Sequence, residues 1–247
     1  MKINKKEKII ISFIVLVLVI LNYSLINNFL KKEFKDKNFR EEIIVIRIID
    51  GDTIESSIGT IRLLGINTPE KGELGYEEAK EYLTKRISNK TLIMEYGSEI
   101  QDKYGRTLGY LFYEDENINL ELIEKGFANP YFPSGEDKYY ETFVLAWNNC
   151  INSNINLCEK SLDYCAECIY LKNFDYQSGL VLFKNICNVD CDLNNWKLQH
   201  EGRSHIFLDF EIKTLEEKEI EFQAWDLSGD TLFLRDSKNK LVLWERY

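Results

Sequence analysis

Positive charge is scarce in the part of the sequence that can fold. The 247 residues contain 31 Lys and Arg against 41 Asp and Glu, so the net charge is −10. Residues 43–147 carry 11 basic and 19 acidic side chains, and residues 165–247 carry 10 and 15. A protein that holds DNA on a broad basic face neutralises many phosphates at once. This composition excludes that mode, so any nucleic acid must be held locally by a few Arg and Lys side chains.

Cysteine is absent from the first 149 residues, so the first globular segment cannot be cross-linked internally. An even number of cysteines behind an export-like N-terminus favours disulfides and an oxidising compartment. The alternative is a structural zinc site formed by four closely spaced thiolates. Both interpretations stay open, with disulfides preferred. The six cysteines are Cys150, Cys158, Cys165, Cys168, Cys187 and Cys191, and the last four are the zinc candidates.

The N-terminus also lacks a small-residue cleavage motif after its apolar run. Four lysines precede the run Ile9–Leu21, which is near the short end of what a bilayer requires. We therefore expect residues 1–28 to form one transmembrane anchor rather than a cleaved signal. Basic residues flank both ends, so charge does not fix the orientation. Together with the cysteines, the anchor predicts a cell-membrane protein whose globular part is extracellular, or a secreted protein if the segment is cleaved.

The remainder divides into two expected domains. Residues 29–42 are a polar linker, and residues 43–147 alternate short apolar runs with helical patterns. Strands at 43–49, 53–57, 60–64, 92–96 and 107–113 and helices at 77–87, 120–125 and 139–149 predict a five-stranded OB-type barrel with packed helices. Residues 148–167 form a Cys-containing connector. About seven short strands in 168–247 predict an immunoglobulin-like β-sandwich. The whole chain is therefore mainly β with helices.

Three polar segments interrupt the barrel strands, and each has an ordinary interpretation when taken alone. Asp50-Gly51-Asp52-Thr53 is a turn, and Asp102-Lys103-Tyr104-Gly105-Arg106 is a hairpin end. Between them, Arg62 leaves an apolar strand, and Thr68-Pro69-Glu70 is typical of a helix start, with Thr68 as N-cap.

The combination of these segments, in this order and at these intervals, resembles the staphylococcal nuclease (thermonuclease) family. The resemblance covers about residues 43–147, through IIVIRIIDGDTI, IRLLGINTPE, GYEEAKEYL, EYGSEIQDKYGRTLGYLF and LIEKGFANPYF. It implies a Ca²⁺-dependent phosphodiesterase. Such a reaction concentrates negative charge on phosphate, so its catalysis depends on charge stabilisation and water activation.

The resemblance also implies the roles of particular residues. Arg62 and Arg106 would place guanidinium forks on the phosphate, which lysine cannot do in a bidentate manner. Asp52 and the Thr68 carbonyl would bind the cation, and Glu70 would orient or deprotonate the attacking water. Asp50 would support the turn that presents Asp52.

Asn67 departs from the family, which usually has a second carboxylate ligand there. An amide oxygen still binds Ca²⁺, but one negative charge is missing from the cage. We therefore expect calcium binding weaker than the family norm by ~1–2 kcal/mol.

Three further residues match positions near the bound nucleotide. Lys103 and Tyr104 correspond to positions beside the 5′-phosphate, and Tyr131 is a candidate base-stacking platform. Ordinary packing is an equally good interpretation of Tyr131.

The C-terminal segment resembles a lamin-tail domain across residues 168–247, through LVLFKN at Leu180–Asn185 and CDLNNWKL at Cys191–Leu198. It contains no recognisable catalytic set, so a binding or anchoring module is expected, with its partner unknown. Its acidity argues against a nucleic-acid grip. The histidines, His200 and His205, flank an expected turn at Glu201-Gly202 and are interpreted as surface residues.

Taken together, these features predict an endonuclease that hydrolyses DNA with little sequence preference and leaves 3′-phosphates, with RNA left open as a substrate. The alternative is a catalytically weak, nuclease-like protein that binds nucleic acid or a surface, in which the sandwich domain mediates adhesion or anchoring.

Overall fold

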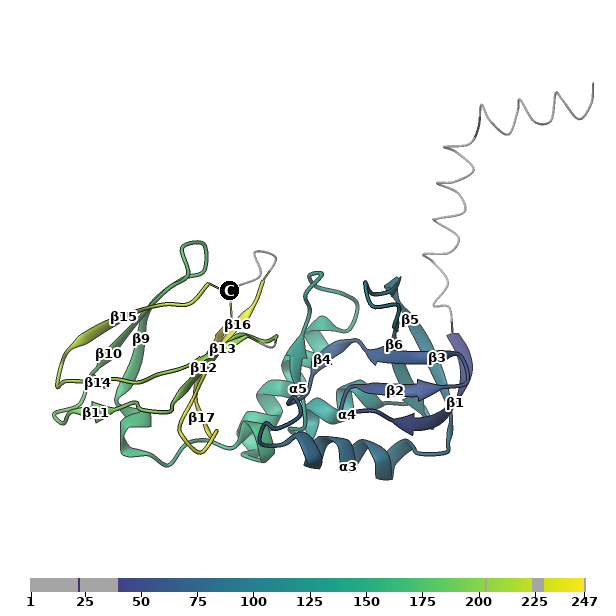
Figure 1. Cartoon of the computed structure of the whole chain (residues 1–247), viewed down its shortest axis with the longest axis horizontal. Coiled ribbons are helices and arrows are strands. Elements are labelled where there is room, and N and C mark those ends of the chain that lie inside the picture. Colours follow the sequence, from purple (N-terminus) through teal and green to yellow (C-terminus); the bar gives the residue numbers. More distant parts are fainter. Residues whose placement is uncertain (1–21, 23–39, 203, 224–228, 247) are drawn as a thin grey trace, which may run out of the picture. The chain divides into compact units, whose positions relative to one another are not determined.

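The computed structural model describes residues 22, 40–202, 204–223 and 229–246 (Figure 1). Glu42–Tyr247 forms one compact unit. The anchor expected in residues 1–28 lies, apart from Asn22, outside the described residues. Within the described ranges, no helix has both the length and the apolar character needed to cross a bilayer.

In the described part of the chain, five strands close into a barrel, as predicted. They follow the order β3-β2-β1-β5-β6, and the parallel pairing of β3 with β6 joins the two ends. In β1, Ile43 and Val45 are buried whereas Ile44 and Ile46 are more than half exposed, the alternation expected of a strand with one face on a core. The strands are β1 (Arg40–Ile48), β2 (Thr53–Ser56), β3 (Gly59–Leu63), β5 (Thr91–Gln101) and β6 (Thr107–Tyr113).

Shorter strands and three helices complete the barrel. Asn117 caps α4, because its side chain accepts a hydrogen bond from Leu120 N. Ala79, Leu83 and Ile87 form the buried face of α3, which follows the predicted periodicity. The elements are β4 (Gly65–Asn67), which pairs with β8 (Asn129–Tyr131), β7 (Glu116–Asn117), α3 (Tyr76–Ile87), α4 (Ile118–Glu124) and α5 (Tyr140–Ser153).

The C-terminal region, residues 169–246, consists of short strands. They form a three-stranded sheet β15-β10-β9, a four-stranded sheet β13-β12-β16-β17 and a ladder β11-β14. Side chains from both larger sheets share one buried cluster, with Trp196 at 1% exposure. The strands are β9 (Ile169–Asp175), β10 (Leu180–Asn185), β11 (Cys191–Asp192), β12 (Lys197–Gln199), β13 (His205–Phe207), β14 (Glu211–Ile212), β15 (Glu217–Glu221), β16 (Thr231–Arg235) and β17 (Leu241–Arg246).

All six cysteines form disulfides. Cys150 at the end of α5 pairs with Cys158 in the short 3-10 helix η1 (Asn156–Cys158). The four candidates for a zinc site pair as Cys165–Cys191 and Cys168–Cys187, next to η2 (Tyr164–Glu167). These bridges fasten the connector to the C-terminal region, and no thiolate is left for a metal ion.

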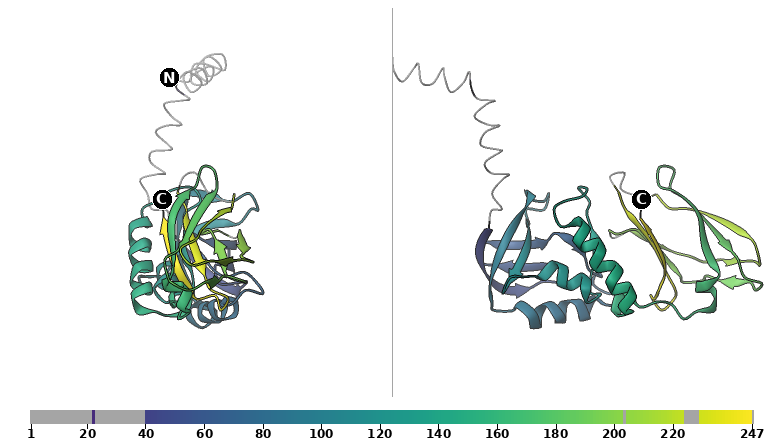
Figure 2. Two further views of the ribbon diagram at one scale, coloured as in Figure 1. Left: turned by 90° about the vertical axis from the view of Figure 1, so that its left-hand side faces the viewer. Right: turned by 180° about the vertical axis from the view of Figure 1, so that it is seen from behind.

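The four-stranded sheet packs against the barrel as well as against its own core. Every residue of β16 is buried. Leu232 and Leu234 belong to the C-terminal cluster, whereas Phe233 points the other way and belongs to the barrel cluster. The rings of Phe233 and Trp147 of α5 meet edge to face with centroids 5.6 Å apart. Figure 1 and the right-hand view of Figure 2 place α5 between the barrel strands and this sheet.

Candidate active site

The acidic turn between β1 and β2 packs directly on the loop that follows β4. Asp50 Oδ1 accepts a hydrogen bond from Asp52 N at 3.1 Å, which fixes the turn. A Cβ on Gly51 would lie 2.8 Å from Thr68 Oγ1, so only glycine permits this approach. Burial raises the pKa of Asp50, and the charge of Asp52 raises it further. The turn therefore concentrates negative charge beside Thr68.

Asp52 is the centre of a buried polar cluster. It is 2% exposed, and its Oδ2 lies 3.0 Å from Arg62 Nη2. The same oxygen accepts hydrogen bonds from Thr68 N at 3.1 Å and from Thr68 Oγ1 at 3.2 Å, while Oδ1 accepts one from Thr53 Oγ1 at 3.0 Å. The carboxylate thus holds β2, β3 and the end of β4 together.

The alternation of side chains along β3 determines the face on which Arg62 lies. Its neighbours Ile61 and Leu63 enter the barrel core, so the guanidinium lies on the opposite face. Arg62 is 7% exposed; its Nη1 donates to the Leu63 carbonyl at 2.5 Å, and its Nη2 lies 3.4 Å from Asn67 Oδ1. A guanidinium held at several points has little freedom to move, which suits the binding of phosphate in one geometry.

Glu70 lies in a loop and not on a helix, so the predicted helix start at Thr68-Pro69-Glu70 is wrong. Glu73 Oε2 accepts a hydrogen bond from Glu70 N at 2.8 Å, and Glu73 N donates to the Glu70 carbonyl at 2.8 Å. Gly72 at φ 94° takes the left-handed region within this turn, which a continuing right-handed helix does not allow. The helix begins later, at Tyr76, after Gly75 in the left-handed region at φ 96°.

The β5–β6 hairpin carries the other cations. Asp102 Oδ2 accepts from Arg106 Nε at 2.7 Å, and its Oδ1 accepts from the backbone N of Tyr104 and of Arg106. Burial raises the pKa of Asp102, but the hydrogen bonds from Arg106 outweigh this and leave the pKa below its ordinary value. Tyr104 is 73% exposed, and the cations of Lys103 and Arg106 lie 5.2 and 5.6 Å from its ring centre.

The register of the barrel brings this hairpin to the cluster around Asp52. Ile61 pairs with Thr107 and Arg62 with Leu108 in the parallel β3–β6 ladder. Arg106, one residue before Thr107, therefore belongs to the same face as Arg62, one side-chain repeat further along.

The structure thus brings Asp50, Asp52, Arg62, Asn67 and Thr68 into direct or bridged contact. Glu70 follows two residues later and lines a hollow that Asn67 and Thr68 also line. The hairpin with Lys103, Tyr104 and Arg106 is placed on the same face by the β3–β6 register. Tyr131 pairs with Gly65 at the outer end of the β4–β8 ladder.

The oxygen atoms of this site are ligands of the kind that a hard cation prefers. Asp52, Thr68, Asn67 and Glu70 offer only oxygen ligands, which Ca²⁺ prefers. Among the described residues, no three His, Cys, Asp or Glu side chains form a metal-binding group. The cation would therefore depend on carbonyl, amide and water oxygens beside few carboxylates.

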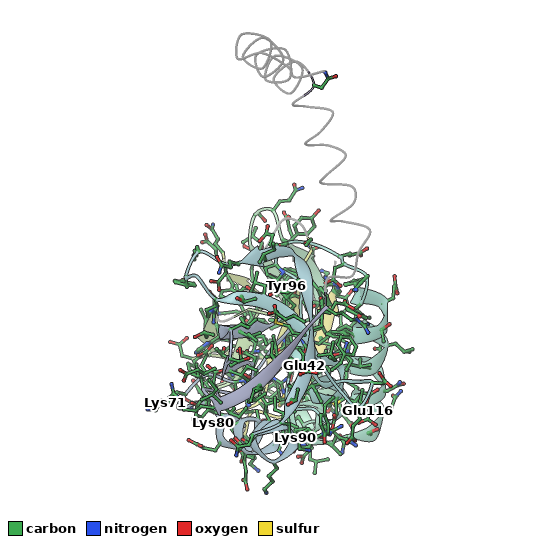
Figure 3. All side chains as sticks on the ribbon, turned by 90° about the vertical axis from the view of Figure 1, so that its right-hand side faces the viewer. Glu42, Lys71, Lys80, Lys90, Tyr96 and Glu116 are labelled. Carbon is green, nitrogen blue, oxygen red and sulfur yellow. A yellow bond between two sulfur atoms is a disulfide. The ribbon has the colours of Figure 1, made fainter. Side chains whose placement is uncertain are left out.

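Beyond the cluster, the barrel surface carries both signs of charge. In the view of Figure 3, Lys71, Lys80 and Lys90 project at the edge of the barrel, and Glu42 and Glu116 lie in the same view. Interleaved charges of this kind give no broad positive field.

The five-stranded topology defines an OB-type barrel. Its polar site combines a buried Asp–Arg pair with a glutamate in the adjoining loop. A family profile described as staphylococcal nuclease homologue matches residues 60–157. A thermonuclease of Staphylococcus intermedius is 34% identical over 49% of this chain and 77% of its own length. The chain belongs to the staphylococcal nuclease family.

Two further relatives support the assignment of the barrel. A thermonuclease of Staphylococcus hyicus is 32% identical over 41% of this chain and 66% of its own length. Endonuclease YhcR of Bacillus subtilis is 34% identical over 42% of this chain but only 10% of its own length. These relatives indicate a nuclease, and the similarity leaves more than half of this chain uncovered.

Sequence reasoning missed the part of the site that the C-terminal region supplies. Asn67 Nδ2 donates to the Gly202 carbonyl at 3.1 Å, and Asn129 Nδ2 donates to the Glu201 carbonyl at 3.0 Å. The expected surface turn at Glu201-Gly202 is therefore buried. His200 is also largely buried, with Nδ1 2.9 Å from Asp230 Oδ2, so its interpretation as a surface residue is wrong. No local pattern in the sequence indicated this contact.

Proposed function

We propose that this protein is a calcium-dependent endonuclease that hydrolyses phosphodiester bonds of DNA with little sequence preference, with RNA left open as a second substrate. The observation that carries the proposal is the continuity of one site: the buried Asp52–Arg62–Thr68 cluster adjoins the hollow that Glu70 lines. Cleavage at the bond to the 5′-oxygen would leave 3′-phosphate ends.

Each side chain has a defined task in this proposal. Arg62, already fixed by Asp52, presents a rigid positive charge to one phosphate oxygen. Arg106 supplies a second guanidinium, held by Asp102 through Nε with its terminal nitrogens left to fork onto phosphate. Glu70 accepts a proton from water and so directs the attack on phosphorus. Lys103 and the exposed Tyr104 would lie beside the 5′-phosphate of the bound nucleotide, and Tyr131 would offer a ring on which a base of any identity can stack.

The cation would be held by Asp52 and the Thr68 carbonyl, with Asn67 as a neutral oxygen donor. When bound, Ca²⁺ supplies positive charge that polarises the phosphoryl group and acidifies a water molecule. The oxygen-only donor set fits such an ion.

The remaining parts of the chain carry proposals of their own. We propose a membrane anchor within residues 1–28 and an extracellular position for residues 43–247, since three disulfides suit an oxidising compartment. We also propose that residues 168–247 are a lamin-tail-like, immunoglobulin-like domain. The packing of two sheets on one buried cluster supports this.

The product ends test the proposed chemistry. A plasmid or a labelled duplex is incubated with the protein and Ca²⁺, and the ends are assayed for extension by a DNA polymerase before and after phosphatase treatment. Extension only after phosphatase treatment is expected, because a 3′-phosphate blocks the polymerase. Ends that extend directly would show a 3′-hydroxyl and would contradict the proposed bond of cleavage.

Asn67→Asp is expected to tighten calcium binding roughly 5–30-fold, the equivalent of ~1–2 kcal/mol, because it restores a negative ligand. It also removes the donor to the Gly202 carbonyl. Asn129→Asp is the matched comparison, since it places the same charge on the register partner of Asn67 and loses the analogous bond to the Glu201 carbonyl. Isothermal calorimetry with Ca²⁺ measures both, and equal affinities for Asn67→Asp and the wild type would refute the expectation.

A further inference from the structure

The loop that carries Glu70 is organised by one carboxylate. Glu73 Oε2 accepts a hydrogen bond from Glu70 N, and Glu73 N donates to the Glu70 carbonyl, both at 2.8 Å. Residues 68–75 contain no helix or strand. Two hydrogen bonds of the Glu70 backbone are made with Glu73, so the place where the Glu73 carboxylate is held contributes to the position of that backbone.

The second oxygen of this carboxylate faces the C-terminal region. Glu73 Oε1 lies 3.5 Å from Lys197 Nζ, and the Lys197 side chain is only 12% exposed. Burial lowers the pKa of Lys197, and the negative charge of Glu73 acts in the opposite direction. A buried ammonium group needs a counter-charge, and Glu73 provides it.

A second cation stands beside Lys197 on the same sheet. Arg235 on β16 is the register partner of Lys197 on β12, so both side chains share one face. The Arg235 guanidinium donates to the carbonyls of Leu157 at 2.7 Å and Asn239 at 3.2 Å, and it also lies within the field of Glu73. The carboxylate thus faces two cations of fixed position.

The sheet itself is fastened to the barrel on either side of this contact. Phe233 packs on Trp147, and the Glu201 carboxylate accepts a hydrogen bond from Phe132 N at 3.1 Å. Asn67 donates to Gly202 within the cation site. Lys197 therefore belongs to a sheet that is fixed to the barrel, and from this sheet it holds Glu73 in place.

We propose that Lys197 is a positioning residue for the nuclease reaction, which acts through Glu73 to hold Glu70 at the reacting phosphate. The C-terminal region is then part of the catalytic unit and not only a separate anchoring module. In the staphylococcal nuclease fold described here, the barrel supplies the reacting groups and the β12–β16 sheet supplies the support for one of them. The kinetic part of this proposal rests on the proposed function.

The test compares Lys197→Met with the wild type in the full chain. Methionine keeps the apolar stem and removes the charge. The kcat for cleavage of DNA is expected to fall about tenfold, because a misplaced catalytic group loses most of its advantage, while KM stays within twofold. Lys197→Arg should recover most of kcat. Glu73→Gln should lower kcat similarly, and the Lys197→Met/Glu73→Gln double variant should be no worse than either single variant.

Lys172→Met is the matched control. Lys172 forms an ion pair with Glu217 at 2.6 Å in the same region, away from this loop and more exposed to solvent. It should leave kcat unchanged. Thermal unfolding of both methionine variants separates a loss of positioning from a loss of folding.

Amide hydrogen exchange gives a readout that does not require activity. The Glu70 amide should exchange about tenfold faster in Lys197→Met than in Lys172→Met, because its acceptor is no longer anchored. Unchanged kcat together with unchanged exchange would overturn the proposal. A raised KM with unchanged kcat would instead make Lys197 a direct phosphate contact, and a raised kcat would make the C-terminal region inhibitory; both also contradict it. Absence of cleavage by the wild type, with faster exchange in the variant, would refute the proposed function alone.

Discussion

Glu70→Gln is expected to lower kcat for DNA cleavage by about 10²–10⁴-fold, the usual contribution of a positioned general base. Glutamine has nearly the same size and still offers an oxygen, but it cannot accept a proton from water. The bond from Glu70 N to Glu73 involves the backbone, so the loop should keep its shape. Steady-state nicking of plasmid DNA measures the loss.

The control for this variant lies on the neighbouring helix. Glu77 is an exposed carboxylate in the first turn of α3, so Glu77→Gln removes the same charge without touching the site. It should retain wild-type kcat. If Glu70→Gln cleaved DNA as fast as Glu77→Gln, Glu70 would have no part in proton transfer, and another base would have to be found.

Arg62→Met is expected to impair both activity and stability. Arg62 and Asp52 form a buried pair, with side chains 8% and 3% exposed and their closest atoms 3.0 Å apart. Removing one partner leaves a buried charge uncompensated, which costs about 3–5 kcal/mol of unfolding free energy. The loss of a preorganised charge at the phosphate should lower kcat by about 10²–10³-fold. Urea unfolding and nicking kinetics measure the two effects.

A second substitution separates these effects. Asp52→Asn in the Arg62→Met background removes the orphaned charge, so most of the lost stability should return. Activity should not return, because the guanidinium and the cation ligand are both gone. A double variant as unstable as Arg62→Met alone would show that the Asp52–Arg62 pair does not account for the loss.

The barrel and most of its site were predictable because they depend on local patterns. Strand periodicity and the turns at Asp50-Gly51 and Gly105 fix the register, and register alone places Arg62 and Arg106 on one face. The resemblance then supplied the roles. Glu70 was predicted on a helix and lies in a loop, because Gly72 and Gly75, both at positive φ, interrupt the helix that Thr68-Pro69 would start.

The contribution of the C-terminal region was not predictable from any local pattern. Glu201-Gly202 has the composition of an exposed turn, and Lys197 that of a surface strand residue. Both are buried because a second face of the β12–β16 sheet docks on the barrel, and tertiary contacts of this kind leave little trace in a single sequence. The uninterrupted burial of β16 reflects the same docking, since a strand covered on both faces loses its alternation.

In the structure, some of the acidic side chains are ion-pair partners of cations. The prediction that nucleic acid is held locally stays a prediction; the two cations assigned to the phosphate are each tied to a carboxylate, Arg62 to Asp52 and Arg106 to Asp102. Each carboxylate fixes the orientation of its cationic side chain and also neutralises part of the positive potential of that side chain. Binding of DNA by this protein should therefore depend less on salt than binding by a basic protein.

The most direct test of the central claim is the rate of plasmid nicking in Ca²⁺, with and without excess chelator, for the wild type and Arg106→Ala. Cleavage by the wild type that stops on chelation and resumes when Ca²⁺ is restored, together with a loss of about 10²-fold or more in Arg106→Ala, is the predicted result. Cleavage at equal rates with and without chelator, or by Arg106→Ala as fast as by the wild type, would contradict a single site in which a cation and two guanidiniums act on one phosphate.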